Sequence, residues 1–546
     1  MVAALKRVTP RKVCAKDAQV MHSKQLILHC GLAAVLCSCV PFVPGALAQE
    51  SGTTTAASSG PETSNAEILK ELDSMRARIQ ELEGRLKQQS AGDSSKDLVQ
   101  QSSSAGESTR NDVQNNTAAA SAEKPQKAEP FAFADFTWLN GNARTKEVPL
   151  DTKFFTPEIR FDTDYIYDLK HPKDDTISGS SEVFRAGEVQ VTQIGVGGDF
   201  HFDNVRGRLM TQFGMYSQTT PRNDASPARG QWNLADAYRY VSEAYGGYHF
   251  NALHGINVDA GIFMSYVGLF SYYNFDNWAY QPSYVSSNTP WFFNGVRVQI
   301  FPTEHLKIEP WFTNGWQSYG RFNNRPGVGM QILWRPNGWL SVLGNQYMLG
   351  EEALNTPGRV RYHTDDSLQI KYYDRPENFL DKMAFSLTGD LGCEHGGGVS
   401  CAGNSAKGPK QSFIGFMVYN RMWFHKDLFG LTLGGGEINN PGRYLVLLPP
   451  INGATAASGT PYFTENPGDP YKAWDASTTF DWMPSQYITF RWEYNHRHAN
   501  VPYFSGPGGV TPPGGNTGDP GSVVSGWAPD LRKTENRFNM AILVKF

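Results

Sequence analysis

The sequence is poor in long hydrophobic runs, in cysteine and in excess charge of one sign. Outside residues 1–50, no apolar run approaches the roughly 20 residues that a membrane-spanning helix needs, which excludes helical membrane spans. The mean hydropathy is -0.44 and 40% of the residues are hydrophobic. The formal net charge of -4 gives no support to a nucleic-acid partner. A membrane protein with this composition must cross the bilayer with strands, of which half the residues face water.

Motifs for common chemistry are also missing. We find no G-x-S-x-G elbow and no phosphate-binding P-loop, and no sequence feature pairs a serine with a histidine. A transporter of the plugged-barrel class would need a globular domain ahead of its barrel, and none is indicated. The sequence therefore predicts neither an enzyme nor a cofactor.

The first 48 residues have the features of a secretory signal. An apolar core runs from Leu26 to Val43, and Ala46-Leu47-Ala48 resembles a cleavage site. The leader is long, so Met21 is a possible alternative start. A weak lipobox at Leu36-Cys37-Ser38-Cys39 leaves a lipoprotein interpretation open. In either case the chain is expected to leave the cytoplasm.

A short coiled coil is predicted over residues 66–88, between a linker at 49–65 and a disordered or extended linker at 89–150. Its apolar residues follow alternating steps of four and three: Ile68, Leu72, Met75, Ile79, Leu82 and Leu86. Such a short coil is not stable alone, which favours an oligomer, expected to be a homotrimer, with the coil in the periplasm. The alternatives are a marginal spacer helix and a coil that grips the cell wall.

The last ten residues alternate between two kinds of side chain. Phe538, Met540, Ile542, Val544 and Phe546 are apolar, while the residues between them are mostly polar or small. This period of two predicts a strand with one apolar face, and its length suits a tilted membrane strand. A chain that ends on such a phenylalanine resembles bacterial outer-membrane proteins, in which the terminal aromatic residue is recognised by the barrel-assembly machinery. That resemblance makes Phe546 the expected assembly signal.

Residues 151–546 read as a series of alternating segments separated by breaks that are short and long in turn. The short breaks include Asp203-Asn204 and His425-Lys426-Asp427, and the long ones include 267–290 and 439–470. This predicts an all-β, up-and-down antiparallel transmembrane barrel of about 16 strands, with 14 to 18 as the range. An even number of strands places both ends of the barrel in the periplasm. A soluble β-sandwich or soluble barrel is the alternative.

Aromatic residues gather beside the short breaks, as in the girdle of a membrane barrel. These are Phe202, Phe250, Phe301, Trp334, Trp482 and Phe546.

The stretch from 255 to 320 is similar to the outer-membrane β-barrel porin-2 (OmpL-like) family. The similarity is carried by Asp259-Ala260-Gly261, the neighbourhood of Asn277-Trp278, Thr289-Pro290 and Gly295-Val296-Arg297. The resemblance covers the barrel but not the coil or linkers. It implies a passive channel and supplies no site residues of its own.

A channel selects by its width and by the charges that line it. Residues of both signs are predicted to face the lumen, so no strong ion preference is expected. We take a subset inside the strands as pore-lining: Arg239, Glu243, Arg297, Arg491 and Glu493.

The third long loop, from Val267 to Trp291, is rich in aromatic residues. By analogy with general porins it is expected to narrow the lumen, with Tyr273, Asp276 and Trp278 at the constriction. Rings in a pore can also stack on sugars, which leaves a carbohydrate-selective channel possible. The alternative is an aromatic plug that packs on the barrel wall.

Only Cys393 and Cys401 lie outside the leader. Both fall in one predicted outer loop in an oxidising compartment, which favours a disulfide over free thiols. A metal site with His395 would lack ligands, so no metal is predicted.

Together these features predict a porin in the outer membrane of a Gram-negative bacterium, surrounded by lipid, that passes small hydrophilic solutes by diffusion. The alternative from another class is a structural anchor or adhesion barrel with a closed lumen.

Overall fold

The computed structural model describes residues 129–177, 183–224, 226, 230–321, 325–350, 358–403, 410–441, 471–515 and 524–546. The predicted signal sequence, coiled coil and linkers up to residue 128 lie outside the described residues. No helix in the described part is long and apolar enough to cross a membrane.

Sixteen long strands form one closed antiparallel barrel. They are β1 (Phe155–Asp168), β2 (Val189–Phe202), β3 (Val205–Thr211), β4 (Val241–Phe250), β5 (Ile256–Met264), β6 (Phe292–Thr303), β7 (Leu306–Thr313), β8 (Gly327–Asn337), β9 (Leu340–Leu349), β10 (Val360–Asp374), β11 (Leu380–His395), β12 (Ser412–Phe424), β13 (Phe429–Asn440), β14 (Tyr471–Ser485), β15 (Ile488–Ala499) and β18 (Thr534–Lys545).

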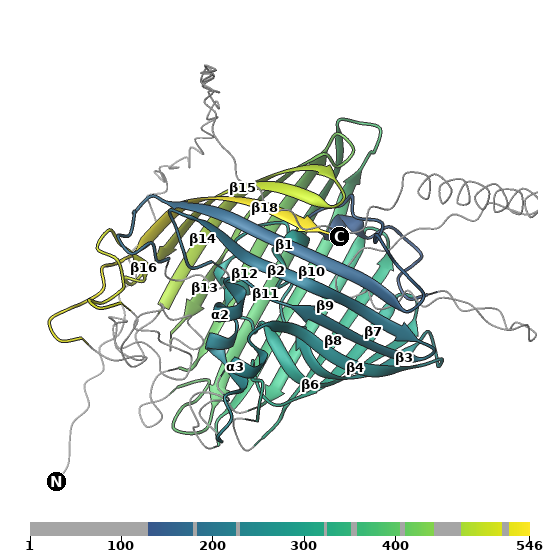
Figure 1. The fold of residues 1–546 in the computed structure, drawn as a ribbon, viewed down its shortest axis with the longest axis horizontal. Helices are drawn as coiled ribbons and strands as arrows, with labels where there is room; N and C mark the ends of the chain where they lie inside the picture. Colours follow the sequence, from purple (N-terminus) through teal and green to yellow (C-terminus); the bar gives the residue numbers. More distant parts are fainter. Residues whose placement is uncertain are drawn as a thin grey trace, which may run out of the picture. The chain divides into compact units, whose positions relative to one another are not determined.

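Each strand pairs with its neighbour in the chain, and β1 closes the ring by pairing with β18 (Figure 1). The predicted barrel of about sixteen strands is confirmed. Each short break that we expected lies at a tight connection, such as 203–204 between β2 and β3. The strand number is even, so residue 155 and the C-terminus lie at the same end of the barrel as the tight turns.

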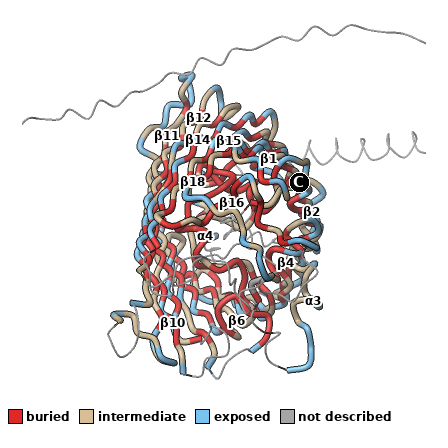
Figure 2. Tube along the Cα trace, turned by 90° about the vertical axis from the view of Figure 1, so that its left-hand side faces the viewer, coloured by how far each residue is buried: buried red, intermediate tan, exposed pale blue. Residues whose placement is uncertain are grey.

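The two faces of each strand meet different surroundings. On β18 the side chains of Phe538, Met540 and Ile542 are exposed on the outside, whereas Arg537 and Asn539 are buried inside. Figure 2 shows this alternation of buried and exposed residues along the strands. The exterior is therefore apolar and the interior is polar, which is the pattern of a barrel surrounded by lipid.

Short helices and one small sheet lie in the connections. They are η2 (Thr137–Leu139), α2 (Tyr216–Thr219), η3 (Pro221–Asn223), α3 (Leu234–Tyr238), η5 (Asn274–Asp276), α4 (Tyr284–Ser287), and the pair β16 (Phe504–Ser505) with β17 (Leu531–Arg532). Of these, η5 and α4 belong to the loop between β5 and β6, and α4 contacts β12, β13 and β14.

Two side chains do not lie on the face of the barrel that the sequence predicted for them. Arg239 is not inside a strand, because β4 begins only at Val241 and the pairing with β3 shifts at Thr211. Phe301 was expected in the outer girdle but is only 2% exposed. The register of β6 shifts between Ile300 and Thr303, and the Phe301 ring packs inside. Strict alternation fails there because a bulge adds one residue to the strand.

The end of the predicted linker also differs from expectation. Residues 129–150 were assigned to a disordered or extended linker, but Phe131, Phe136 and Trp138 are at most 1% exposed. They pack inside the barrel near the tight turns, and Phe131 joins Phe301 and Leu333 in one apolar cluster. The segment from 131 to 147 is called the strap below.

Candidate pore constriction

The loop between β5 and β6, residues 265–291, has no exposed residue. A connection of this length normally lies on the surface, because its backbone polar groups need partners. Figure 2 shows α4, which belongs to this loop, within the ring of strands. The loop is thus folded into the lumen, and its backbone must find hydrogen bonds there.

Charged side chains of β1 and β18 hold the first half of the loop. The carboxylate of Asp276 accepts from Arg160 Nη1 at 2.7 Å and from Lys545 Nζ at 2.6 Å. The amide of Asn274 donates to Asp162 Oδ2 at 2.8 Å. All five side chains are at most 7% exposed. Charge-assisted bonds of this kind are stronger than neutral ones, and more so away from bulk water.

Side chains of β14 and β15 hold the loop backbone itself. Arg491 Nη2 donates to the carbonyl oxygen of Asn277 at 2.7 Å. Glu493 accepts from the backbone nitrogens of Tyr280 and Gln281 at 2.7 and 2.9 Å. Further along, Asp475 Oδ2 accepts from the nitrogen of Tyr284 at 3.0 Å. These contacts satisfy four polar backbone groups of the loop and fix its path along one wall of the barrel.

Most aromatic rings of the loop pack on the wall. Trp278 lies edge-on to Trp423 with ring centroids 5.7 Å apart, and it is 3% exposed. Tyr273 donates its hydroxyl to Glu243 Oε1 at 2.9 Å. Burial raises the pKa of Tyr273 well above its ordinary value, so the phenol remains a donor. In these positions the rings of Trp278 and Tyr273 are not available to stack on a passing sugar.

The strap enters the lumen from the opposite end, beside the tight turns. It crosses from the β6–β7 turn, where Phe131 N donates to the Glu304 carbonyl oxygen at 2.8 Å, toward the β14–β15 turn. There Thr145 Oγ1 donates to the Gln486 carbonyl oxygen at 3.0 Å. In between, Trp138 Nε1 donates to the Gly338 carbonyl oxygen at 3.1 Å.

The strap and the loop meet at Gly141. The nitrogen of Gly141 donates to the Asp276 carbonyl oxygen at 2.9 Å. A Cβ added at Gly141 would lie 2.4 Å from the Asn277 oxygen and 2.5 Å from the Phe275 oxygen, so only glycine fits without movement. Arg421 joins both segments, because its guanidinium donates to the carbonyl oxygens of Gly141 and Trp278 at 2.5 and 3.2 Å.

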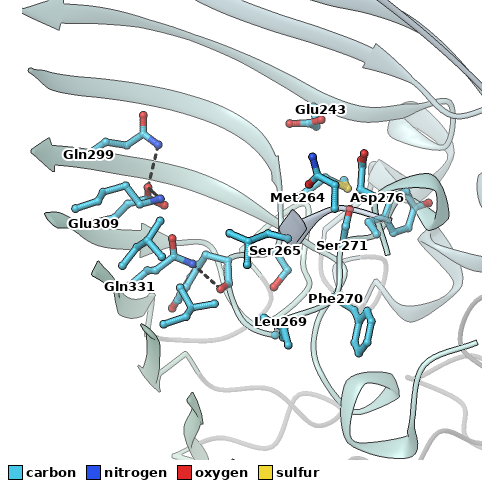
Figure 3. Close-up of a pocket in the computed structure, with 18 of the residues that line it drawn as sticks. Glu243, Met264, Ser265, Leu269, Phe270, Ser271, Asp276, Gln299, Glu309 and Gln331 are labelled. Carbon is cyan, nitrogen blue, oxygen red and sulfur yellow. Dashed lines mark hydrogen bonds and ion pairs between the residues drawn. The ribbon is translucent and has the colours of Figure 1, made fainter. Parts of the chain in front are cut away.

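A cavity of about 200 Å³ remains beside the loop, between the loop, the strap and the wall formed by β1 and β3–β10 (Figure 3). Figure 3 shows Glu243 and Asp276 near one end of it, and Gln299, Glu309 and Gln331 along the wall. The rings of Phe270 and Tyr272 also line it. The cavity is therefore bordered by charged, amide and aromatic groups together.

The charges around the cavity are mostly paired with each other. Arg208 contacts Asp199, Glu158 and Glu243 at 2.9, 3.1 and 2.9 Å. Lys307 contacts Glu309 at 2.8 Å. The cavity is thus lined by charges of both signs, most of which form ion pairs.

The predicted pore residues fall into three groups. Glu243, Asp276 and Arg297 line the cavity. Tyr273, Trp278, Arg491 and Glu493 lie behind or within the loop and hold it, rather than lining the cavity. Arg239 belongs to neither group, because it lies after α3 and forms an ion pair with Asp236. Sequence reasoning missed the strap and Gly141, although the aromatic run Phe131, Phe133, Phe136 and Trp138 signalled a buried segment.

The remaining predicted residues lie away from the cavity. Cys393 and Cys401 form a disulfide at the outer end of β11, with their Cα atoms 5.2 Å apart. Phe546 follows the last strand, where its nitrogen donates to the Ile159 carbonyl oxygen at 2.9 Å, and its ring is 45% exposed. Among the described residues, no group of three His, Cys, Asp or Glu side chains is arranged to hold a metal ion.

Comparison with known proteins gives a family and a set of similar structures. The family model described as "Putative beta-barrel porin-2, OmpL-like" matches residues 161–524. No curated protein matches this chain.

Among solved structures, the outer membrane channel DcaP of Acinetobacter baumannii is 12% identical with a TM-score of 0.41, covering 72% of this chain and 97% of that one. OmpT of Vibrio cholerae is 9% identical with a TM-score of 0.40, covering 73% and 99%. OprB of Pseudomonas putida is 10% identical with a TM-score of 0.40, covering 72% and 94%.

Proposed function

This chain belongs to the β-barrel porin-2, OmpL-like family, and we propose that it is an outer-membrane porin through which small hydrophilic solutes diffuse passively. The observation that carries the proposal is the cavity between the inserted loop and the wall of β6–β10, inside a barrel with a polar interior. An aqueous path needs polar walls, and Gln299, Gln331 and the ion pair of Lys307 with Glu309 line the cavity here.

The outer membrane is the proposed location. Exposed aromatic and aliphatic side chains cover the outside of β14, β15 and β18, among them Trp474, Trp492 and Ile542. Hydrocarbon accommodates only structures with every backbone group paired, and a closed barrel meets that condition. The signal sequence expected over residues 1–48 fits the same location.

The mechanism is diffusion past a fixed constriction. The loop is held by carboxylates and guanidinium groups along one wall, so the passage runs along the other wall, past Glu243, Arg297 and Glu309. Charges of both signs line this passage, so we expect neither cations nor anions to be strongly excluded as a class. No catalytic step is part of this function.

Solute flux into vesicles tests the proposal. The refolded full chain is reconstituted into liposomes, and swelling is followed with glycine, glucose, a disaccharide and a tetrasaccharide. We expect fast uptake of the smallest solutes and a steep decline with size. If a folded barrel admits none of them, the porin assignment fails and the closed structural barrel replaces it. If a sugar passes much faster than an amino acid of similar size, the carbohydrate-selective alternative is favoured.

A homotrimer is part of the same proposal. It is based on the heptad pattern predicted at residues 66–88, a segment outside the described residues. Native mass spectrometry of the detergent-solubilised full chain should give three copies, and deletion of 66–88 should give monomers. If the deletion leaves the trimer intact, the coil has another role, such as attachment to the cell wall.

A further inference from the structure

The cavity contains one basic side chain that differs from the others. Arg160, Arg208, Arg297 and Lys307 all line the cavity, and each pairs with a carboxylate at 2.7 to 3.0 Å. Arg335 also lines it and is 5% exposed, yet no ion pair joins it to a residue that the structure describes. Its Nε is buried, and no described residue accepts a hydrogen bond from it.

The lack of a partner is notable because arginine retains its charge in proteins. A guanidinium taken out of bulk water without an opposite charge is unfavourable, and natural proteins normally pair it. Here the contacts of the guanidinium are aromatic. Its central carbon lies 5.1 Å from the ring centre of Phe131 and 4.7 Å from that of Phe136.

Both rings come from the strap, whereas Arg335 comes from β8. Aromatic rings against a guanidinium stabilise its charge but leave its N–H groups unused. Those groups form a planar set of donors that matches two oxygens of a carboxylate or phosphate. The strap thus holds the side chain in place without neutralising it.

Uncharged polar groups lie on the next strands along the wall. Ser341 of β9 and Gln369 of β10 are directly paired across the strands, and both line the same cavity. A hydroxyl and an amide can each donate to an oxyanion. On the other side of β8, Lys307 is committed to Glu309.

We propose that Arg335, backed by Phe131 and Phe136 of the strap, is a binding site for the oxyanion group of a small solute, a carboxylate or a phosphate, at the turn-side end of the passage. This inference rests on the proposed function in that the solute reaches Arg335 through the lumen. The anionic group of such a solute would give up its contacts with bulk water and form an ion pair with the guanidinium of Arg335, which lies against the two aromatic rings. The solute would then leave the barrel.

Binding can be measured without conduction, which separates the two proposals. The folded full chain in detergent micelles is titrated with inorganic phosphate, followed by ³¹P line broadening, and with acetate, followed by saturation-transfer ¹H NMR. Arg335→Gln removes the charge but keeps an amide. We expect the apparent dissociation constant to rise roughly tenfold or more, as for the loss of a charge-assisted hydrogen bond.

Three further variants define the site. Arg335→Lys keeps the charge but loses the planar set of donors, so weakened binding is expected, between that of the native chain and Arg335→Gln. Phe136→Ala removes one ring of the strap and should weaken binding severalfold. Arg361→Gln makes the same charge change on β10, outside this cavity, where the native arginine pairs with Glu394 at 2.7 Å, and should leave binding unchanged.

Every outcome decides the inference. If the native chain binds phosphate or acetate preferentially and Arg335→Gln loses this binding, the site is supported. The preferred probe then shows whether the site takes a phosphate or a carboxylate group. Equal binding by the native chain and Arg335→Gln overturns it, as does the absence of binding by both probes. Heat-modifiable migration in electrophoresis shows that each variant is folded. A chain that binds phosphate but fails to admit solutes into liposomes would contradict the porin proposal alone.

Discussion

Gly141 is the residue at which two insertions into the lumen touch. Its backbone nitrogen donates a hydrogen bond to the Asp276 carbonyl oxygen, and its backbone oxygen accepts one from Arg421. The neighbours that a Cβ would strike are backbone oxygens of Phe275 and Asn277, which cannot rotate away as a side chain would. The contact between strap and loop therefore depends on a missing side chain.

Substitution of Gly141 by alanine should separate the strap from the loop. Overpacking of this kind costs about 1–3 kcal/mol, and here it falls on one contact rather than on the barrel. We expect noisier open-channel current with an unchanged barrel melting temperature. Gly246→Ala is the matched control, because a Cβ there meets nothing within 4 Å. Identical current noise in the two variants would show that Gly141 does not hold the strap against the loop.

Glu493 is the carboxylate that accepts from two successive backbone nitrogens of the loop, and its exposed fraction is 2%. In Glu493→Gln an amide replaces one acceptor oxygen with a donor, leaving a buried backbone N–H without a partner. Such a loss costs about 1–3 kcal/mol. We expect the loop to become susceptible to proteolysis in the folded barrel. Glu437→Gln, at an exposed position on β13, should show native resistance. Equal resistance of both would mean that Glu493 does not hold the loop.

At the scale of elements, the strands were the predictable part. Alternation along β18 and β15 is dictated by lipid on one face and lumen on the other, so the sequence itself records it. The alternation fails after Ile300, where a bulge shifts the register and turns Phe301 inward, whereas Arg239 was misassigned because β4 begins only at Val241. A bulge is set by pairing with the neighbouring strand, which a single strand's pattern does not record.

The inserted loop could be predicted only in outline. Its length and aromatic content indicated a role in the lumen, but the wall on which it packs depends on distant partners such as Asp276 with Lys545. For the same reason Arg491 and Glu493 were expected to line the pore, whereas they lie behind the loop. The strap was missed because its aromatic residues have no helical or strand period.

Replacing residues 269–288 by a short glycine-serine connection should widen the passage. The loop fills one side of the lumen, so its removal is expected to raise single-channel conductance severalfold. The barrel should still form, because its strand pairs are untouched, although Arg491 and Glu493 lose partners and the melting temperature should fall. Unchanged conductance would show that the loop does not limit the current.

Removal of the disulfide should destabilise only the loop that it closes and should leave solute transport unchanged. It spans a sequence separation of 8 at the outer end of β11. A loop of this size gains roughly 2–3 kcal/mol from the cross-link in the chain-entropy account. The double variant Cys393→Ser with Cys401→Ser is expected to be cleaved faster by protease between these positions, with native conductance. An altered conductance would place this loop in the passage.

At the scale of the whole molecule, the barrel is narrowed from both ends. The loop enters from the side of the long connections and the strap from the side of the tight turns, and they meet through Gly141 and Arg421. The cavity that remains lies beside the loop, along the wall of β1 and β3–β10. Under the proposed function, this arrangement would restrict solute size while leaving charges of both signs in contact with the solute.

Removal of the strap tests its share of the constriction. A chain that begins its mature part at residue 148 lacks the contacts at Glu304, Gly338 and Gln486. We expect larger conductance and weaker discrimination by solute size. The sixteen-strand barrel should fold without it, since each of the sixteen barrel strands lies beyond residue 154. Size discrimination equal to that of the native chain would assign the constriction to the loop alone.

The central claim is that this barrel holds an open, polar passage beside its inserted loop. Single-channel conductance of the refolded full chain in a planar lipid bilayer tests it most directly. We predict steady, small current steps, and larger steps when residues 269–288 are replaced. The absence of steps from protein shown to be folded, both with and without the loop, would contradict the claim and indicate a closed structural barrel.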